Sequence, residues 1–387
     1  MVRTTIVTGT AAAALLLAGC GSGGEPVVLD QAATSPAVES PAVTAEPPAS
    51  PSPVESPRPS GPGEVAVPSI VDTVATGLRS PWGLAFLPDG TALVSERDTA
   101  RIVRVSDGQV GEVGTVPGVS FGGEGGLLGL AVAPTFADDR FVYAYATTPN
   151  GNQVVRMTLV GGRLSAPEVL LDGIPASSIH NGGRLAFGPD GMLYVTTGDA
   201  ADTALSPRPE SLAGKVLRLT PDGDVPPDNP DPASPVWSSG HRNVQGIAWD
   251  AEGNLWASEF GANTWDELNL IEPGADYGWP DVEGAGGTDA GFADPAVQWP
   301  TDQASPSGIA VADGTVFMAS LRGARLWAVP VGAGRAGEPQ AFFTGELGRL
   351  RTVAEAPDGT LWLVTNNTDG RGSPGPDDDR IIALTLD

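Results

Sequence analysis

The stretch WGLAFLPDG at residues 82–90, continued by ALVSE at residues 92–96, combines two apolar runs with an Asp-Gly pair between them. This pattern is a strong short-range signal for a β-hairpin. The same phrase returns as GRLAFGPDG at 183–191, QGIAWDAEG at 245–253 and TVAEAPDG at 352–359, each time followed by a second apolar run. Two weaker copies are LGLAVAP at 128–134 and GIAVADG at 308–314. The chain therefore repeats one hairpin unit six times.

A third apolar run follows each hairpin and predicts a third strand in every unit. These runs cover residues 101–105, 154–159, 216–219, 267–271, 325–329 and 381–386. Six such units at blade-sized spacing predict an all-β fold, a six-bladed β-propeller. A β-sandwich is the alternative architecture, but it gives no reason for a recurring phrase. The apolar run at residues 70–74 precedes the first unit, and we expect it to close the ring as the outer strand of the last blade.

Composition excludes several classes of protein. The 387 residues include 21 Lys and Arg against 47 Asp and Glu, which gives a net charge of −26. Such a charge opposes nucleic-acid binding, because phosphate contacts need a basic face. The single cysteine allows neither an internal disulfide nor a thiolate zinc cage. The 52 Gly and 37 Pro residues argue against a long-helix bundle.

The N-terminal segment has the layout of a bacterial signal peptide. Arg3 precedes a short apolar run, and the sequence LAGC at residues 17–20 is similar to a lipobox, in which the cysteine is lipidated. An ordinary secretory signal is the alternative. We expect a signal peptide at 1–19, a disordered Pro/Ser/Ala-rich tether at 20–68 and the propeller at 69–387. Lipid on Cys20 would be the only membrane attachment and would anchor the protein outside the cytoplasm.

Departures from the repeat indicate where function lies, because propeller sites occupy the loops around one mouth of the central channel. The segment SIHNGGR brings His180, one of only two histidines, to the start of an inner strand, and GHRN places Arg242 ahead of the next blade. Arg322, Arg349 and Arg351 enter from the last two blades and suggest a bound anion. The bland alternatives are a structural histidine and arginines that pair with this chain's surplus carboxylates.

Several motifs in a fixed order resemble the soluble quinoprotein glucose dehydrogenases and aldose sugar dehydrogenases, from about residue 74 to residue 386. They are GLLG at 126–129, GKVLR at 214–218, GHRN at 240–243, DELNLI at 266–271 and YGWP at 277–280. The resemblance implies a sugar dehydrogenase that uses pyrroloquinoline quinone (PQQ) and calcium. It would oxidise the anomeric C1 hydroxyl of an aldose to a lactone and pass electrons to an acceptor that the sequence does not identify.

The resemblance also implies roles for individual residues. His180 matches the catalytic base, and Arg242 with Asn243 matches the pair that contacts the quinone oxygens. Calcium would be held by the backbone carbonyls of Gly261 and Ala262. The other expected cofactor contacts are Glu124, Trp299, Thr301, Arg322, Arg349 and Arg351.

Three positions depart from the family pattern. Arg322 stands where the glucose dehydrogenases have Lys, and Glu124 and Phe260 stand where they have Gln. The long loops that shape the sugar pocket of glucose dehydrogenases are absent or short here, so a broad aldose preference is expected. Two other functions compete with this one: a non-catalytic propeller that binds carbohydrate or protein at the cell surface, and a calcium-dependent propeller hydrolase. A hydrolase of that kind requires side-chain carboxylates as metal ligands, whereas the channel-entry positions here are mainly His, Arg and Asn.

Overall fold

A computed structural model describes residues 61–387, and in it every copy of the repeat forms the two innermost strands of an antiparallel sheet. The first copy gives β2 (Pro81–Phe86) and β3 (Ala92–Glu96), with Leu84 paired to Val94. The Asp-Gly turn between them is closed by the Leu87 N–H, which donates to the Thr91 carbonyl at 2.8 Å. Gly90 has φ of +85°, a conformation that glycine adopts without steric cost. The hairpins predicted from the phrase are confirmed.

The first three blades follow one another along the chain, each running from the channel outward. Blade 1 is β2, β3, β4 (Arg101–Ser106) and β5 (Gln109–Thr115); blade 2 is β6 (Leu127–Val132), β7 (Phe141–Thr148), β8 (Gly151–Val160) and β10 (Glu168–Ile174), with β9 (Arg163–Leu164) on β8; blade 3 is β11 (Leu185–Phe187), β12 (Leu193–Thr196), β13 (Val216–Leu219) and β14 (Val236–Ser238). The short helix α1 (Phe136–Asp139) links β6 to β7, and a 3₁₀ turn, Thr203–Leu205, follows β12.

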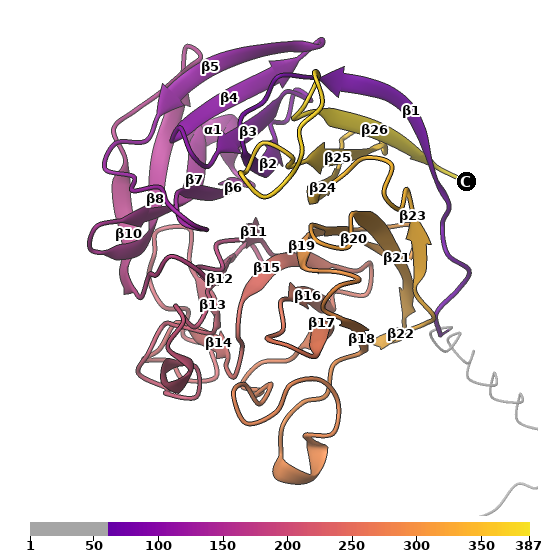
Figure 1. Ribbon diagram of the computed structural model, residues 1–387. Helices are drawn as coiled ribbons and strands as arrows, with labels where there is room; N and C mark the ends of the chain where they lie inside the picture. Colours follow the sequence, from indigo (N-terminus) through magenta and orange to yellow (C-terminus); the bar gives the residue numbers. More distant parts are fainter. Residues whose placement is uncertain (1–60) are drawn as a thin grey trace, which may run out of the picture. The chain divides into compact units, whose positions relative to one another are not determined.

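The last three blades repeat this order. Blade 4 is β15 (Val244–Trp249), β16 (Leu255–Glu259), β17 (Trp265–Ile271) and β18 (Val297–Pro300); blade 5 is β19 (Pro306–Ala312), β20 (Thr315–Ser320), β21 (Arg325–Gly332) and β23 (Gln340–Phe342), with β22 (Arg335–Ala336) on β21; blade 6 is β24 (Leu350–Glu355), β25 (Leu361–Thr365), β26 (Ile381–Leu386) and β1 (Pro68–Ala75). A second 3₁₀ turn, Thr288–Ala290, lies in the loop before β18. The six sheets surround a central axis (Figure 1), so the predicted six-bladed β-propeller and its third strands are confirmed.

One position of the repeat explains how closely the inner strands approach each other. It is glycine in four blades, at Gly83, Gly129, Gly246 and Gly308. A Cβ atom at Gly83 would lie 2.7 Å from the Leu130 nitrogen of the next blade, and one at Gly129 would lie 2.9 Å from the Leu185 nitrogen. Real Cβ atoms do not come so close, so only glycine fits. The repeated glycine therefore allows neighbouring inner strands to touch around the axis.

The ring is closed by a strand from the start of the described chain. Strand β1 pairs antiparallel with β26, from Pro68 opposite Leu386 to Ala75 opposite Ile381 (Figure 1). The closing role expected for residues 70–74 is confirmed. Contacts with the propeller begin before the expected boundary at residue 69: Val67 exchanges backbone hydrogen bonds with Asp387, and the Ala66 N–H donates to Thr315 Oγ1 at 3.1 Å. The expected signal peptide and lipidated Cys20 lie outside the described residues, as does most of the expected tether.

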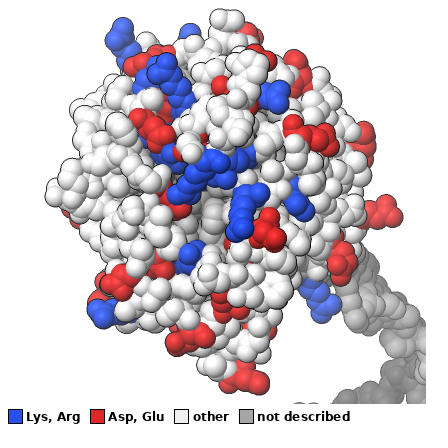
Figure 2. Space-filling model, in the orientation of Figure 1, with Lys and Arg blue, Asp and Glu red and all other residues white. Residues whose placement is uncertain are grey.

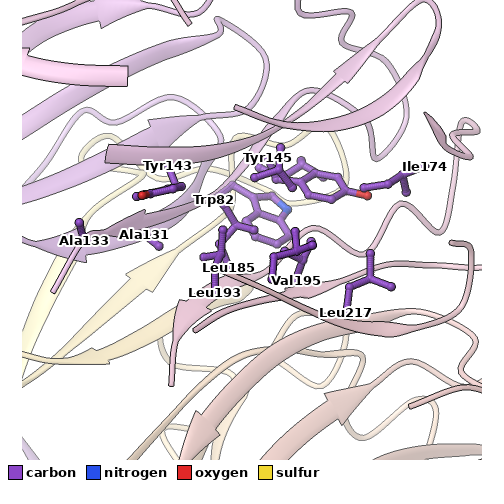
Figure 3. Packing of buried hydrophobic residues seen from close by; sticks show 13 residues of the cluster. Trp82, Ala131, Ala133, Tyr143, Tyr145, Ile174, Leu185, Leu193, Val195 and Leu217 are labelled. Atoms are coloured by element: carbon purple, nitrogen blue, oxygen red, sulfur yellow. The ribbon is translucent and has the colours of Figure 1, made fainter. Parts of the chain in front are cut away.

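The core lies between neighbouring blades. Figure 3 shows the cluster between blades 2 and 3, in which Tyr143 and Tyr145 of β7 face Leu185, Leu193 and other side chains of blade 3. The Tyr143 ring packs edge-on against Phe187 at 5.1 Å. Such aromatic pairs add to the free energy gained by burying the rings. Among residues 61–387, no helix is long and apolar enough to cross a membrane.

We predict that a chain beginning at Gly77, which lacks β1, is less stable than one beginning at Gly61. Its loss would leave β26 as an unpaired sheet edge and would expose the apolar cluster beneath Ala75 and Leu78. We expect a fall in Tm on the order of 10 °C and a tendency to aggregate, measured by calorimetry and light scattering. Equal Tm values for the two chains would contradict the closing role of β1.

Candidate active site

The predicted site residues converge because most of them precede an inner strand. Glu124 precedes β6, His180 precedes β11, Arg242 and Asn243 precede β15, and Arg349 precedes β24. All of these loops reach the same end of the channel, which we call the site mouth. The chain order of the inner strands thus brings together residues more than 200 positions apart.

His180 is held between a carboxylate and a guanidinium. Its Nδ1 lies 2.7 Å from Asp199 Oδ1, and its Nε2 lies 2.8 Å from Arg242 Nη2. The ionised carboxylate can only accept a hydrogen bond and the guanidinium can only donate one, so Nδ1 carries the proton and Nε2 presents its lone pair. The arrangement fixes a neutral imidazole with a basic nitrogen at the site mouth.

The backbone of His180 is also constrained. Its φ is +58°, in the left-handed region that few residues other than glycine adopt. Its N–H donates to Glu124 Oε2 at 2.9 Å, and Glu124 Oε1 pairs with Arg371 Nη1 at 3.1 Å. Arg371 therefore balances the negative charge that Glu124 introduces at the family's Gln position. Strained backbone held by several contacts is typical of functional sites.

Asp199 is fully buried and bonded on both oxygens. Its Oδ2 accepts a hydrogen bond from Trp279 Nε1 at 2.9 Å, and its Oδ1 also accepts one from the Ala201 N–H at 2.8 Å. Burial alone would raise the pKa of this carboxyl, but the bonds from His180, Ala201 and Trp279 hold the pKa below its ordinary value. Asp199 consequently stays ionised and keeps the His180 ring in one orientation.

Arg242 links the two halves of the site. Its backbone N–H donates to Glu259 Oε1, and its Nη1 donates to the Phe260 carbonyl at 3.3 Å. Burial lowers the pKa of Arg242, and the nearby carboxylates of Asp199 and Glu259 oppose that effect. Asn243 is buried, and its Oδ1 accepts a hydrogen bond from the Gly182 N–H at 2.9 Å, which ties blade 4 to the His180 loop.

A group of arginines surrounds one carboxylate on the opposite side of the mouth. Arg349 pairs with Asp369 at 3.0 Å, Arg351 lies 3.9 Å from the same oxygen, and Arg97 donates to the Asp369 carbonyl. Burial, and then repulsion by Arg97 and Arg349, lowers the pKa of Arg351 to about 9. Figure 2 shows Lys and Arg side chains gathered near the middle of this face. A cationic patch therefore lies on a chain whose net charge is −26.

The structure places the other predicted cofactor contacts farther from His180. Arg322 is exposed in the turn between β20 and β21 and makes no ion pair within residues 61–387. Trp299 packs against Trp327 with ring centroids 5.6 Å apart, and its Nε1 has no hydrogen-bond partner in the described chain. Thr301 follows it at the end of β18 and is half-buried. No hydrogen bond joins these three residues to the His180 group in the described part.

The loop with the predicted calcium ligands directs its amide groups inward. The Gly261 N–H donates to Asp266 Oδ1 at 2.9 Å, and the Ala262 N–H donates to Glu283 Oε1 at 2.6 Å. The carbonyl oxygens of Gly261 and Ala262 accept no hydrogen bond from residues 61–387. Within the same residues, no group of three or more His, Cys, Asp or Glu side chains is arranged to hold a metal.

Three residues of the site, Asp199, Arg371 and Asp369, were missed in the sequence. Asp199 follows the second strand of blade 3, at the same end as His180, so the register of the repeat could have indicated it. Arg371 and Asp369 lie in the long connection between β25 and β26, outside the repeat. No local pattern marks their partners.

Comparison with known proteins identifies the family. Residues 78–373 match the family model described as Glucose / Sorbosone dehydrogenase. The chain belongs to this family. The resemblance noted in the sequence is confirmed.

Members of this family include relatives over most of the chain. The structure of a PQQ-bound aldose sugar dehydrogenase from Streptomyces coelicolor is 56% identical, covers 84% of this chain and 100% of that one, and superposes with a TM-score of 0.82. An aldose sugar dehydrogenase of Escherichia coli is 30% identical and covers 78% of this chain and 91% of its own length. Quinoprotein glucose dehydrogenase B of Acinetobacter calcoaceticus is 36% identical over 57% of this chain and 54% of its own.

We predict that Asp199→Asn changes the tautomer of His180. An amide placed with its NH2 toward Nδ1 would draw the proton to Nε2, whereas the wild type carries it on Nδ1. Nitrogen NMR shifts of the ring report which nitrogen is protonated, and an unchanged tautomer would contradict the role given to Asp199.

The same substitution has an expected pH signature. Because the folded-state pKa of Asp199 is depressed, its contribution to stability is present above the unfolded pKa of about 3.9 and is lost as pH falls through the folded value. The difference in Tm between wild type and Asp199→Asn should therefore be constant from pH 5 to 7 and shrink below about pH 4. A difference that grows in acid would be the wrong sign.

Proposed function

We propose that this protein is a PQQ-dependent aldose dehydrogenase that oxidises the C1 hydroxyl of sugars to lactones. The observation that carries the proposal is the His180 group: a neutral imidazole, fixed by Asp199 and Arg242, beside a cationic patch that shares one central carboxylate. Family membership and the PQQ-bound relative support it. The non-catalytic and hydrolytic alternatives become outcomes of the tests below.

The residues at the site mouth fit a tricarboxylate cofactor such as PQQ. Arg349 and Arg351 share Asp369, and Arg322 has no carboxylate partner in the described part of the chain, so positive charge remains for an anion. Arginine binds carboxylates through paired N–H groups. Trp299, with its buried Nε1 unpaired within the described residues, and Thr301 offer a packing surface and a hydroxyl. Arg242 and Asn243 would face the quinone oxygens.

Calcium fits the carbonyls of Gly261 and Ala262. They accept no hydrogen bond from the described residues, while the amide groups of the same loop are held by Asp266 and Glu283. Hard cations prefer oxygen ligands, and backbone carbonyls are common among them. In this proposal the loop holds a calcium ion that polarises the bound cofactor.

The proton chemistry follows from the residues themselves. When bound, PQQ supplies a quinone that accepts hydride from C1 of the sugar. His180 Nε2, whose lone pair faces the mouth, takes the proton from the anomeric hydroxyl. Asp199 stabilises the imidazolium that this transfer creates, because its carboxylate already accepts the Nδ1–H. Arg242, bonded to Nε2 here, moves its donor to developing negative charge when the substrate hydroxyl takes its place.

The proposal extends to substrate and location. We propose a broad aldose preference, since the loops that shape the pocket of glucose dehydrogenases are short or absent in this sequence. We also propose that Cys20 is lipidated and anchors the propeller outside the cytoplasm, on the strength of LAGC at residues 17–20. The physiological electron acceptor would be a separate molecule.

Reconstitution separates catalysis from binding. With PQQ and calcium added to the purified protein, we expect dye-linked oxidation of several aldoses. His180→Ala should bind PQQ with near wild-type affinity, because it leaves the arginine patch intact, while turnover falls about 10²–10⁴-fold. Spectroscopic titration gives the affinity and the dye assay gives turnover.

Arg349→Ala is the matched control. Losing one charge-assisted contact of about 1.5–3 kcal/mol should weaken PQQ binding roughly 10- to 150-fold, with turnover recovered at saturating cofactor. A fully active His180→Ala protein would refute the mechanism. PQQ binding without aldose oxidation would favour the non-catalytic propeller, and lactone hydrolysis without PQQ would favour the hydrolase.

The location is tested by Cys20→Ala. Without the acceptor thiol, the signal peptide should remain uncleaved or the protein should leave the membrane fraction, and metabolic labelling with a radioactive fatty acid should vanish. Wild-type membrane attachment and labelling in Cys20→Ala would contradict lipidation at this residue.

A further inference from the structure

The channel has a second cavity at the end opposite the site mouth. It has a volume of about 420 Å³ and is lined mainly by the later residues of inner strands β2, β11, β15, β19 and β24. Leu84, Phe187, Ile247, Ile309 and Val353 contribute to its largely apolar wall. None of the residues placed in the proposed active site lines it. This cavity, which we call the lower cavity, has no role in the proposed function.

Arg184 lies at the boundary between the two ends of the channel. It occupies the repeat position that is glycine in blades 1, 2, 4 and 5, and Thr352 occupies that position in blade 6. The two side chains meet across the axis: Arg184 Nη2 donates to Thr352 Oγ1 at 3.1 Å, and its Nε donates to the Gln245 carbonyl at 2.8 Å. A Cβ at Gly308 would lie 3.0 Å from Nη2, so glycine there makes room for the guanidinium.

The charge of Arg184 is not neutralised by the protein. The side chain is more than nine-tenths buried, and no carboxylate in residues 61–387 forms an ion pair with it. Its guanidinium lies 4.2 Å from the centre of the Trp82 ring, and its Nη1 makes no hydrogen bond to the described chain. Burial lowers the pKa of Arg184 to about 9, so it still carries its charge at neutral pH. An isolated buried cation is costly unless a counter-ion is bound.

We propose that the lower cavity binds a compact monovalent anion on the Arg184 guanidinium. Arg184 lines the cavity, and the Thr352 hydroxyl beside it already donates to the Trp82 carbonyl at 2.7 Å, so the guanidinium supplies the charge-assisted donors. One uncompensated cation matches one negative charge. A halide and the head of a small carboxylate share this chemistry, and the apolar wall suits the short tail of the latter.

The cavity also contains an opposing charge that provides a control. Glu355 lines it three residues beyond Thr352 on β24, about 10 Å along the strand. Its carboxylate would repel a bound anion weakly at that distance through solvent. Removing the Glu355 charge should therefore strengthen anion binding, whereas removing the Arg184 charge should abolish it.

The experiment measures Tm of the full chain against sodium bromide and, in parallel, sodium acetate. At about ten times Kd we expect the wild type to gain roughly 2–4 °C beyond the general salt effect, which Arg184→Gln measures in the same salts. Glu355→Gln should bind about two- to fourfold more tightly. Arg349→Gln, which alters the site mouth, should keep the wild-type response. A response to both salts indicates a general anion site, and a response to acetate alone indicates a carboxylate site.

Crystallography localises the ion and does not depend on whether Arg184→Gln folds. Wild-type crystals soaked in bromide should show an anomalous peak within hydrogen-bond distance of Arg184 Nη1. A peak only at the site-mouth arginines, or no peak, would overturn the proposal. So would equal Tm responses of wild type and a folded Arg184→Gln.

Discussion

The close approach of the inner strands around the axis is the constraint on which the rest of this structure depends. It is possible only because one position of the repeat is glycine in four of six blades, where a Cβ would overlap the backbone of the next blade. Strands that touch leave a narrow channel, so loops from blades 2, 3, 4 and 6 converge at its mouth. His180 can therefore meet Arg242 at 2.8 Å although 62 residues separate them. Fold and site share one cause.

The two blades without that glycine divide the channel into two chemical environments. Arg184 and Thr352 stand on opposite blades and join across the axis, with Trp82 beneath the guanidinium. Above them lie polar groups such as Gln245 and Arg351, which are bonded to each other at 2.8 Å. Below them the wall is largely apolar. A departure from a repeat can thus be structural and functional at once, because the side chain that fills the axis also brings an unpaired charge there.

The sequence predicted the fold well because the information is local. Each Asp-Gly hairpin carries its own turn signal, and the closing strand at residues 70–74 could be inferred because one apolar run was left over. The site was predicted less completely, and His180 and Arg242 came from departures and resemblance. Asp369 and Arg371 could not be found, since Arg371 meets Glu124 from 247 residues away and only the ring geometry brings them together. Carbonyl ligands leave no side-chain signature, so Gly261 and Ala262 rested on resemblance alone.

Charge is distributed in a way that the net value of −26 conceals. At the site mouth, carboxylates are placed where they orient cations: Asp199 holds His180, Glu124 holds both the His180 backbone and Arg371, and Asp369 gathers Arg349 and Arg351. Each of these acids is bonded on the side away from the open mouth or shared among several donors, so cationic groups are what a ligand meets first. An acidic surface and an anion-binding mouth are therefore compatible. The same reasoning explains why Glu124 can replace a neutral Gln: its charge is balanced by Arg371 before a cofactor carboxylate could be repelled by it.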